Sequence, residues 1–262
     1  MPTLTVSLAQ INVRAGNPRV NWDTVQERTA EAARRGSELV IFPELWDNGY
    51  ALDKAKETAS QINGGLFAQV AALSRSANIH ILGSMLEKRG VGVYNSAALF
   101  SPGRGVIGAY RKIHLFGLMN EPQFLSPGEA PLTVDAPWGR TSVAICYDLR
   151  FPELLRRYAV EGAKLLLLPA EWPVERINHW RTLIQARAIE NQYYVVACNC
   201  IGEHNGTTYG GHSMVVDPWG NLVAEAGDGE TMLTVQIDLD TVDAIRQRMP
   251  VLEDRRSNLY NA

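Results

Sequence analysis

The residue pattern of positions 32–46 recurs at positions 158–172. Each stretch runs from the end of a helical segment through a glycine turn into an apolar strand, and then reaches a proline, an acid and a tryptophan. The turn at 136–139 matches the turn at 217–220 in the same way. Two unrelated α/β segments can share such a pattern by chance, but here it favours two similar halves. Such halves bury their apolar faces as one layered domain, with two sheets face to face and helices outside.

Strand and helix signals alternate along all 262 residues, and no linker separates the halves. We therefore expect a layered α/β fold in a single domain over residues 1–262. The predicted strands cover residues 4–11, 38–42, 79–87, 94–100, 105–110, 142–145, 164–169, 193–201, 210–217, 221–225 and 231–237. The predicted helices cover residues 21–35, 66–76, 152–160 and 176–190, with a short helix from residue 239. Residues 112–130 have no clear periodicity, and a long irregular loop inside a compact domain is usually functional.

Charge and hydropathy exclude some classes of partner. The formal net charge is −3 and no block of like charge occurs, so we expect neither nucleic acid nor a membrane surface as a partner. The longest apolar runs, such as residues 165–168, have the length of a strand and fall far short of the roughly 20 residues of a membrane span. No basic segment followed by an apolar one opens the chain, so no signal peptide is expected.

The three cysteines are Cys146, Cys198 and Cys200. Cys198 and Cys200 lie two residues apart in a predicted strand, where parallel side chains have poor geometry for a mutual disulfide. We therefore expect a reduced, cytoplasmic protein. No His/Cys spacing resembles a zinc ligand set, so we expect no metal and no cofactor.

Cys146 lies where a predicted strand turns into a helix. The apolar run 142–145 leads into it, and Pro152 suits the first turn of the helix that follows. Backbone N–H groups at such a turn favour negative charge, which suits a thiol nucleophile. The alternative is a small buried hydrophobic residue, which most free cysteines are.

Two further side chains could complete a reactive group. Glu44 ends the predicted strand 38–42 and could serve as general base to a thiol and general acid to a leaving group. The alternative is a carboxylate that caps backbone N–H groups. Lys112 follows the strand 105–110 and could stabilise an oxyanion and lower the pKa of the thiol, or lie on the surface. Glu121, in the irregular loop, is expected to be solvated on the residues alone.

Four segments together resemble the nitrilase superfamily, the carbon–nitrogen hydrolases. They are Phe42-Pro43-Glu44-Leu45, Arg111-Lys112-Ile113-His114-Leu115, Cys146-Tyr147-Asp148-Leu149-Arg150-Phe151-Pro152-Glu153 and Gly211-His212-Ser213. The resemblance extends from the first strand to about Asp238. It implies a four-layer α-β-β-α sandwich of two pseudo-symmetric halves and a catalytic Glu44–Lys112–Cys146 triad. It also implies that Glu121, which precedes an L-S-P-G turn, is a second catalytic glutamate.

Within that superfamily the chain looks most like the short amidases near the omega-amidase branch. The segments that carry this finer resemblance are 149–154, 171–173, 179–180 and 186–191. It implies a thiol amidase that hydrolyses a small aliphatic amide, such as the omega-amide 2-oxoglutaramate, to acid and ammonia through a thioester. A nitrilase, an N-carbamoyl-amide hydrolase, an acyltransferase and an idle binding scaffold remain as alternatives.

The resemblance also suggests what surrounds the thiol. Tyr147 would supply an oxyanion N–H, and Tyr50, Trp46 and Trp172 could wall the pocket or serve packing. A carboxylate on the substrate would call for an arginine, but we expect Arg150 to pair with Asp148, Glu153 or another acid. We assign structural roles to His114, His179 and His212. Superfamily members commonly pair, so we expect a homodimer or higher homo-oligomer with the tail at about 249–262 at an interface.

Overall fold

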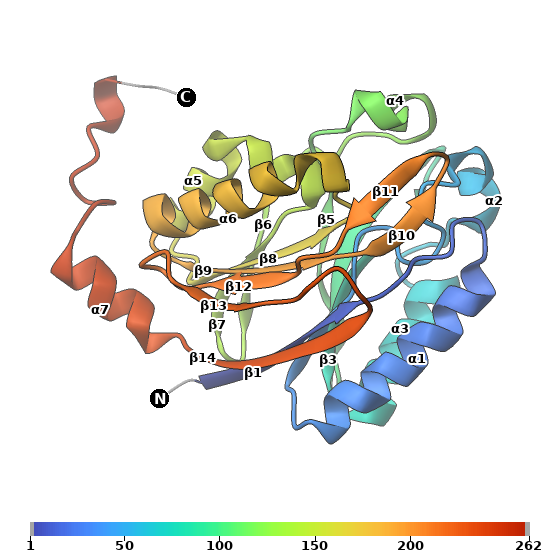
Figure 1. Ribbon diagram of the computed structural model, residues 1–262, viewed down its shortest axis with the longest axis horizontal. Coiled ribbons are helices and arrows are strands. Elements are labelled where there is room, and N and C mark those ends of the chain that lie inside the picture. The colour runs from blue at the N-terminus through green and yellow to red at the C-terminus, as the bar shows by residue number, and fades with distance from the viewer. Residues whose placement is uncertain (1–2, 260–262) are drawn as a thin grey trace.

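Two six-stranded sheets pack face to face in the computed structural model, which describes residues 3–259 (Figure 1). The first sheet has the order β14 (Thr231–Asp238), β1 (Thr3–Gln10), β2 (Leu39–Ile41), β3 (His80–Arg89), β4 (Gly92–Ser101) and β5 (Gly105–Arg111). The second has the order β13 (Leu222–Glu225), β12 (Met214–Val216), β9 (Tyr194–Asn199), β8 (Leu165–Ala170), β7 (Gly139–Val143) and β6 (Leu132–Ala136). Most of the predicted strands are therefore confirmed. β6 is a strand that the sequence analysis did not predict.

The two sheets repeat one pairing pattern. In the first, β1, β2 and β3 are parallel neighbours, with β14 antiparallel to β1 and β4 antiparallel to β3. In the second, β7, β8 and β9 are parallel, with β6 antiparallel to β7 and β12 antiparallel to β9. β2 therefore corresponds to β8, as the sequence repeat predicted, and the expected layered α/β fold is confirmed.

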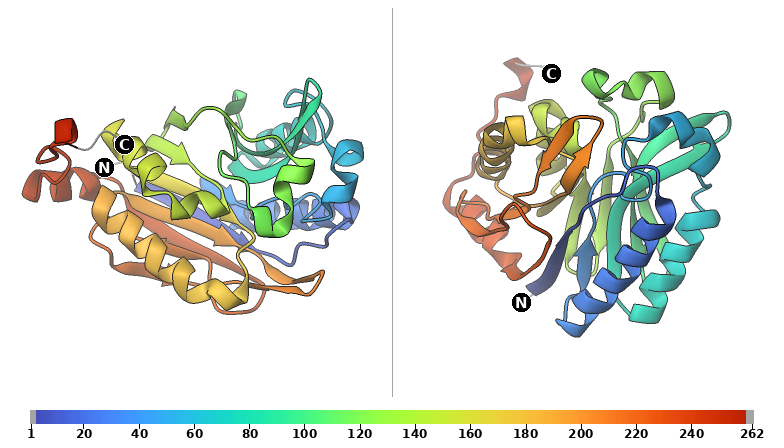
Figure 2. Two further views of the ribbon diagram at one scale, coloured as in Figure 1. Left: turned by 90° about the horizontal axis from the view of Figure 1, so that it is seen from above. Right: turned by 45° about the vertical axis from the view of Figure 1, so that its right-hand side comes forward.

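Helices cover the outer face of each sheet, which Figure 2 shows from two further directions. α1 (Pro18–Arg34) and α3 (Gly65–Ala77) lie on the first sheet, and α5 (Pro152–Val160) and α6 (Ile177–Asn191) lie on the second. α1 begins with a proline at its first position and buries Asn21, Val25, Thr29 and Ala32 along one stripe. Trp22, rather than joining that stripe, lies at its edge and stacks on Trp46. No helix between residues 3 and 259 is long and apolar enough to cross a membrane.

The core forms two apolar clusters. One lies between the sheets and under α5 and α6, and it includes Leu8, Ile41 and Leu167. The other lies between the first sheet and α1 and α3, and it includes Val25, Phe42 and Phe67. The strands β2 and β8 are wholly buried because both faces of each sheet are covered, which explains their unbroken apolar runs.

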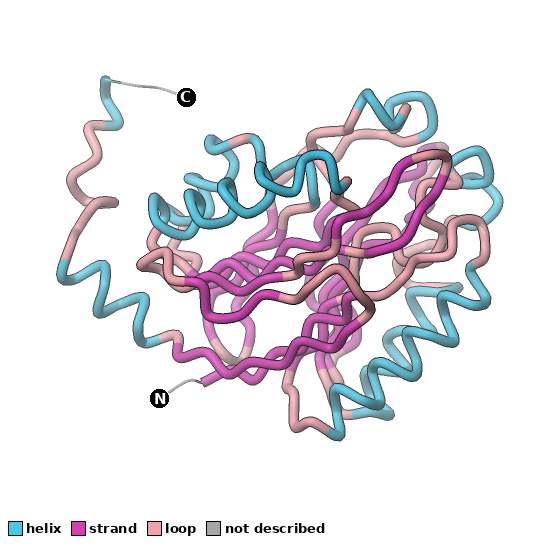
Figure 3. Tube along the Cα trace, viewed as in Figure 1, coloured by secondary structure: helices cyan, strands magenta, loops and turns pink. Residues whose placement is uncertain are grey.

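Short elements gather at the ends of the parallel strands (Figure 3). They are η1 (Leu52–Lys54), α2 (Ala55–Thr58), η2 (Gly117–Met119), α4 (Glu121–Phe124), η3 (Cys146–Arg150), η4 (Val174–Arg176), and the hairpin of β10 (Ile201–His204) and β11 (Thr207–Gly210). The last elements of the described residues are α7 (Asp240–Arg248) and η5 (Ser257–Leu259).

The predictions of unbroken strands at 193–201 and 210–217 were wrong. β9 ends at Asn199, and the β10–β11 pair forms a separate two-stranded sheet before β12 begins. The Asn199 side chain donates from Nδ2 to the carbonyls of Trp172 (3.2 Å) and Gly211 (2.7 Å), which are contacts that a continuing strand could not make. The hairpin then turns at Asn205 and Gly206, both with positive φ.

Candidate active site

The Cys146 thiol is presented by a sharp turn after β7. Cys146 opens η3 with φ of +43°, a left-handed conformation that is unfavourable for a residue with a side chain. The buried Asp148 stabilises the turn, because its Oδ2 accepts the N–H of Ile145 at 2.9 Å and its own N–H donates to the carbonyl of Ile145 at 2.9 Å. Pro152 then begins α5 as predicted. The strand-to-helix turn thus holds the thiol at the edge of the second sheet.

Asp148 also ties this turn to the segment that carries Lys112. Its Oδ2 accepts the Tyr110 hydroxyl at 2.8 Å, and its Oδ1 accepts the His114 backbone N–H at 3.1 Å and lies 2.7 Å from His114 Nδ1. The His114 ring stacks on Phe151 with centroids 3.6 Å apart. One buried carboxylate therefore positions the end of β5 relative to the nucleophile turn. The sequence analysis singled out Asp148 only as a partner for Arg150.

Lys112 lies buried between two carboxylates. Its Nζ donates to Glu44 Oε1 at 2.7 Å and to Glu121 Oε1 at 2.6 Å, and none of the three side chains is exposed to solvent. Burial alone would lower the pKa of Lys112, but the charges of Glu121 and Glu44 hold it well above its usual value. The ammonium group is therefore charged at neutral pH.

Both carboxylates receive further hydrogen bonds. Glu44 Oε1 accepts the Asn95 amide at 2.8 Å, and Glu44 Oε2 accepts the backbone N–H of Glu171 at 3.0 Å. Glu121 Oε1 accepts the Tyr50 hydroxyl at 2.6 Å, and its Oε2 accepts the backbone N–H of Phe116 at 2.7 Å. These donors fix the orientation of both carboxylates around Lys112. The sequence analysis named neither Asn95 nor Phe116, since a strand asparagine and a loop phenylalanine carry no signal of this role.

Glu121 is not a solvated loop residue, contrary to the expectation from the residues alone. It begins α4 and is fully buried. Burial raises its pKa above the usual value, and the neighbouring Lys112 opposes that rise. A carboxyl that shares a lysine with a second carboxyl titrates as part of the group, so its proton belongs to the cluster as a whole.

The thiol itself is held protonated. Burial raises the pKa of Cys146 well above its usual value, the nearby Glu44 carboxylate raises it further, and Lys112 offsets only part of this. Lys112 does lower the thiol pKa, as expected, but burial and the charge of Glu44 outweigh it, so the net shift is upward. Glu44 is also a hydrogen-bond partner of the thiol. The resting arrangement is thus a neutral thiol beside a carboxylate that can accept its proton.

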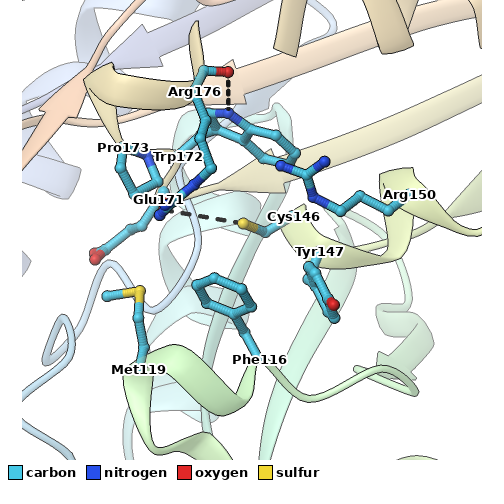
Figure 4. Close-up of a pocket in the computed structure, with 9 residues that line it drawn as sticks. All are labelled: Phe116, Met119, Cys146, Tyr147, Arg150, Glu171, Trp172, Pro173 and Arg176. Carbon is cyan, nitrogen blue, oxygen red and sulfur yellow. Dashed lines mark hydrogen bonds between the residues drawn. The ribbon is translucent and has the colours of Figure 1, made fainter. Parts of the chain in front are cut away.

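A narrow pocket opens onto Cys146 (Figure 4). Its empty volume is about 270 Å³, including the part that is open to solvent. Its lining residues are Phe116, Met119, Cys146, Tyr147, Arg150, Glu171, Trp172, Pro173 and Arg176.

Of the four residues that were expected around the thiol, two line the pocket and two lie elsewhere. Tyr147 and Trp172 line it. Tyr50 lies behind it, bonded to Glu121, and borders a second and larger hollow that also reaches Met119. Trp46 packs in the core under α1, with its ring 6.3 Å from Phe42.

Glu171 is a site residue that the sequence analysis did not name as catalytic. It occupies the place after β8 that Glu44 occupies after β2, and the repeat of acid and tryptophan at 32–46 and 158–172 was the signal for it. Burial, then the charge of Glu44, raises the pKa of Glu171 well above its usual value, which disfavours its charged form. Its Oε1 is buried and makes no hydrogen bond among the described residues.

Arg150 was expected to pair with Asp148, Glu153 or another acid, but it pairs with neither of these two residues. Its guanidinium lies over the Trp172 ring, 4.8 Å from the centroid, and one of its nitrogens lies 3.4 Å from His179 Nδ1. Asp148 is unavailable because its oxygens are taken by Tyr110, His114 and the Ile145 N–H. Within residues 3–259, no group of three or more His, Cys, Asp or Glu side chains is arranged to hold a metal ion.

Comparisons with known proteins agree with this geometry. The family model for carbon–nitrogen hydrolases matches residues 5–247. The chain is 36% identical over 257 residues to 2-oxoglutaramate amidase of Bacillus subtilis (strain 168), covering 98% of this chain and 99% of that protein. It is 35% identical to the human Omega-amidase NIT2 over 240 residues, 88% of this chain and 87% of that protein.

A similar solved structure has a modified cysteine in its active site. The fold is similar to a mutant of the amidase from Nesterenkonia sp. AN1, with a TM-score of 0.88, 26% identity and 98% of each chain covered. That structure shows the product of Michael addition of acrylamide at the active-site cysteine of the amidase.

Proposed function

The chain belongs to the carbon–nitrogen hydrolase family of the nitrilase superfamily, and from this membership we propose that it is a thiol amidase. Its substrate is a small aliphatic amide, the omega-amide of a dicarboxylate such as 2-oxoglutaramate, and its products are the acid and ammonia. The observation that carries this proposal is the buried Glu44–Lys112–Glu121 cluster beside the Cys146 thiol, which itself lines a small pocket. The 2-oxoglutaramate amidase of B. subtilis supports the choice of substrate class.

In the first half of the reaction, Glu44 takes the thiol proton as the sulfur of Cys146 attacks the amide carbonyl carbon. The carbonyl oxygen gains negative charge, and Lys112 and the backbone N–H of Tyr147 stabilise it. One such donor typically contributes about 3 kcal/mol in the transition state. Glu44 then passes its proton to the amide nitrogen, and the C–N bond breaks. Ammonia departs, and the acyl group remains on Cys146 as a thioester.

In the second half, Glu44 takes a proton from water as the water oxygen attacks the thioester carbon. The C–S bond breaks, the proton returns to sulfur, and the carboxylic acid departs. Glu121 holds Lys112 in place through the 2.6 Å contact and is itself held by Tyr50 and Phe116. The neutral thiol of the resting protein fits this cycle, because Glu44 carries the proton at each step.

Ammonia release from a substrate panel tests the proposal. The panel holds short neutral amides, omega-amides of dicarboxylates, nitriles and N-carbamoyl compounds. We expect turnover of amides by the wild-type protein, none by Cys146→Ala, and a loss of about 10²- to 10⁴-fold in kcat with Glu44→Gln. Turnover of a nitrile with silence on every amide would contradict the amidase assignment, and silence on the whole panel would favour an idle scaffold.

We also propose that the protein is a homodimer through the outer face of α5 and α6. Val160 and Ile189 on these helices are about half exposed, and the segment after α7 extends away from the body of the molecule (Figure 1). The expected interface tail at 249–262 includes residues 260–262, which lie outside the described residues. Sedimentation should show a dimer that Val160→Glu weakens and that Val91→Glu, on the fully exposed turn between β3 and β4, leaves intact.

The chemistry favours a reducing compartment, as the sequence analysis expected for a cytoplasmic protein. Cys146 must be a free thiol to attack the amide, and all three cysteines are free. Thiols stay reduced in the cytoplasm, where glutathione and thioredoxin reverse their oxidation. We therefore expect mild oxidation to abolish turnover and a reductant to restore it.

A further inference from the structure

Two arginines line the pocket above Cys146, and neither is paired with an acid. Arg150 comes from the nucleophile turn η3, and Arg176 comes from the end of η4 (Figure 4). Within residues 3–259, the Arg176 guanidinium makes no hydrogen bond or ion pair, and Arg150 has only the 3.4 Å contact with His179. On the neighbouring helices, by contrast, Arg157 pairs with Glu161 and Arg187 pairs with Glu190.

The two guanidiniums also lie close enough for the charge of one to affect the pKa of the other. Burial lowers the pKa of Arg150, and the charge of Arg176 is the next largest cause. Like charges held close together without a counter-ion cost free energy, and a bound anion removes that cost. Glu171 shares the pocket with them, but among the described residues its carboxyl makes no ion pair with either arginine, and burial raises its pKa and so disfavours the charged form.

Aromatic rings hold both guanidiniums in position. Arg150 lies 4.8 Å from the centroid of Trp172, and Arg176 lies 5.6 Å from the centroid of Phe116. Trp172 is itself fixed, since its Nε1 donates to the backbone carbonyl of Arg176 at 2.8 Å. Stacking of this kind leaves the N–H groups of a guanidinium free to point along its plane toward a ligand.

We propose that Arg176 and Arg150 bind a carboxylate at the end of the substrate remote from the scissile amide. This inference rests on the proposed amidase function and assigns the residues that recognise its acidic substrates. A guanidinium presents N–H donors in a fork that matches the two oxygens of a carboxylate. The reacting carbonyl lies at Cys146 and the acid lies under the arginines, so the small pocket selects short monoamides of dicarboxylic acids over neutral or cationic amides.

Paired substrates test the role of the arginines. Glutaric acid monoamide carries the carboxylate, and pentanamide is a neutral amide with the same five-carbon chain. We expect Arg176→Gln to lower kcat/KM for the acidic amide by about 10- to 100-fold, as the loss of a charge-assisted hydrogen bond implies. The kcat/KM for pentanamide should stay within about threefold. Arg150→Gln should act in the same direction, and Arg176→Lys, which keeps the charge but loses the fork, should fall between.

Arg157→Gln is the matched control. Arg157 lies on α5, is largely exposed and pairs with Glu161, so its replacement changes net charge by the same amount outside the pocket. It should leave the ratio of kcat/KM between the two substrates unchanged. An equal loss on both substrates with Arg176→Gln, or no loss on either, would overturn the assignment while leaving the amidase function in place.

A binding measurement separates this inference from the chemistry. Cys146→Ala protein should bind glutarate in calorimetry, and adding Arg176→Gln should weaken that binding by at least tenfold. Unchanged glutarate binding in the double variant, or no preference of the wild-type enzyme for the acidic amide, would overturn the inference. If the wild-type protein hydrolyses no amide but the arginine-dependent binding is found, the proposed reaction fails and the carboxylate site stands.

Discussion

At the scale of single residues, the central feature is a lysine that neutralises two buried carboxylates. The Lys112 Nζ lies within 2.7 Å of both Glu44 and Glu121, and all three side chains are fully buried. A complete buried ion group is close to neutral in its net contribution to stability, but removal of one member leaves uncompensated charge. Replacement of any member of the cluster should therefore affect folding as well as the proposed catalysis.

Lys112→Gln should destabilise the protein by about 3–5 kcal/mol at pH 8, because two buried carboxylates would then face each other without a cation. In the variant both carboxyls would have native pKa values above their unfolded values. Such groups destabilise the native state most above the native pKa, and the penalty declines as the pH falls from the native pKa toward the unfolded one. The difference from wild type in urea unfolding should therefore shrink between pH 8 and pH 5.

Lys88→Gln provides the comparison for that prediction. Lys88 is an exposed residue near the end of β3, so its replacement should change the unfolding free energy by no more than about 0.5 kcal/mol at either pH. A deficit for Lys112→Gln that is the same at pH 5 and pH 8 would show that the lost lysine acts through packing rather than charge.

Asp47 is a second buried carboxyl with a predicted effect on stability. Burial raises its pKa to about 6, although Oδ2 accepts the Leu86 N–H at 3.1 Å. The raised value means that Asp47 lowers stability as the pH rises from about 4 to about 6, by roughly 3 kcal/mol for a shift of about two units. Asp47→Asn should gain about that much relative to wild type between pH 4 and pH 7 in urea titrations. If the unfolding free energies of the two proteins changed with pH in parallel, a raised pKa of Asp47 would be excluded.

The sequence predicts the reactive side chains better than the groups that support them. Glu44, Lys112, Glu121 and Cys146 lie in motifs, and the structure brings them together. Asn95 and Asp148 act through contacts across strands and loops, and Arg176 has no acidic partner among residues 3–259, so local sequence carries little information about these roles. Glu171 is the exception, because the internal repeat places it opposite Glu44.

At the scale of elements, one glycine allows the loop after β5 to close over the site. The Gly128 N–H donates to the carbonyl of Lys112 at 2.8 Å. A Cβ on Gly128 would lie 2.1 Å from the carbonyl oxygen of Arg111, a distance that no side chain can tolerate. The backbones of the loop and of the end of β5 can approach this closely only because residue 128 lacks a side chain.

Gly128→Ala should therefore displace the loop together with Lys112. We expect a loss of about 1–3 kcal/mol in unfolding free energy and a clear fall in kcat, measured by urea unfolding and ammonia release. Gly117→Ala in the same loop is the control for stability, since a Cβ there meets nothing within 4 Å. Equal stability of the two variants would contradict the close-approach argument.

The long strands and helices could be predicted from their hydrophobic periods, whereas the short elements could not. α5 and α6 match their predicted ranges within a residue. α4 and the β10–β11 hairpin depend on tertiary contacts, such as those of Glu121 with Lys112 and of Asn199 with Gly211. Periodicity cannot register a four-residue element whose stability comes from another part of the chain.

At the scale of the whole molecule, the active site lies where the two halves meet. Glu44 follows β2, and its pseudo-symmetric counterpart Glu171 follows β8 and donates a backbone N–H to it at 3.0 Å. Cys146 comes from the neighbouring strand β7. The internal repeat therefore places one acid of each half at this junction, where the first contacts Lys112 and burial raises the pKa of the second.

The halves are also joined at the chain ends. β14 pairs with β1 along eight residues, so the last strand of the molecule completes the first sheet. The ring of Trp138, from the second half, contacts His80 of the first, with centroids 4.9 Å apart. Neither half can keep its sheet buried without the other, and we accordingly predict a single cooperative unfolding transition.

Fluorotryptophan labelling tests this prediction, because the tryptophans report from both halves. Trp22 and Trp46 lie in the first half, and Trp138, Trp172, Trp180 and Trp219 lie in the second. All native ¹⁹F resonances should lose intensity with one urea midpoint, since the cluster of Leu8, Ile41 and Leu167 between the sheets must open for either half to unfold. Loss of the Trp22 and Trp46 signals at a lower urea concentration than the others would mean that the halves unfold as separate domains.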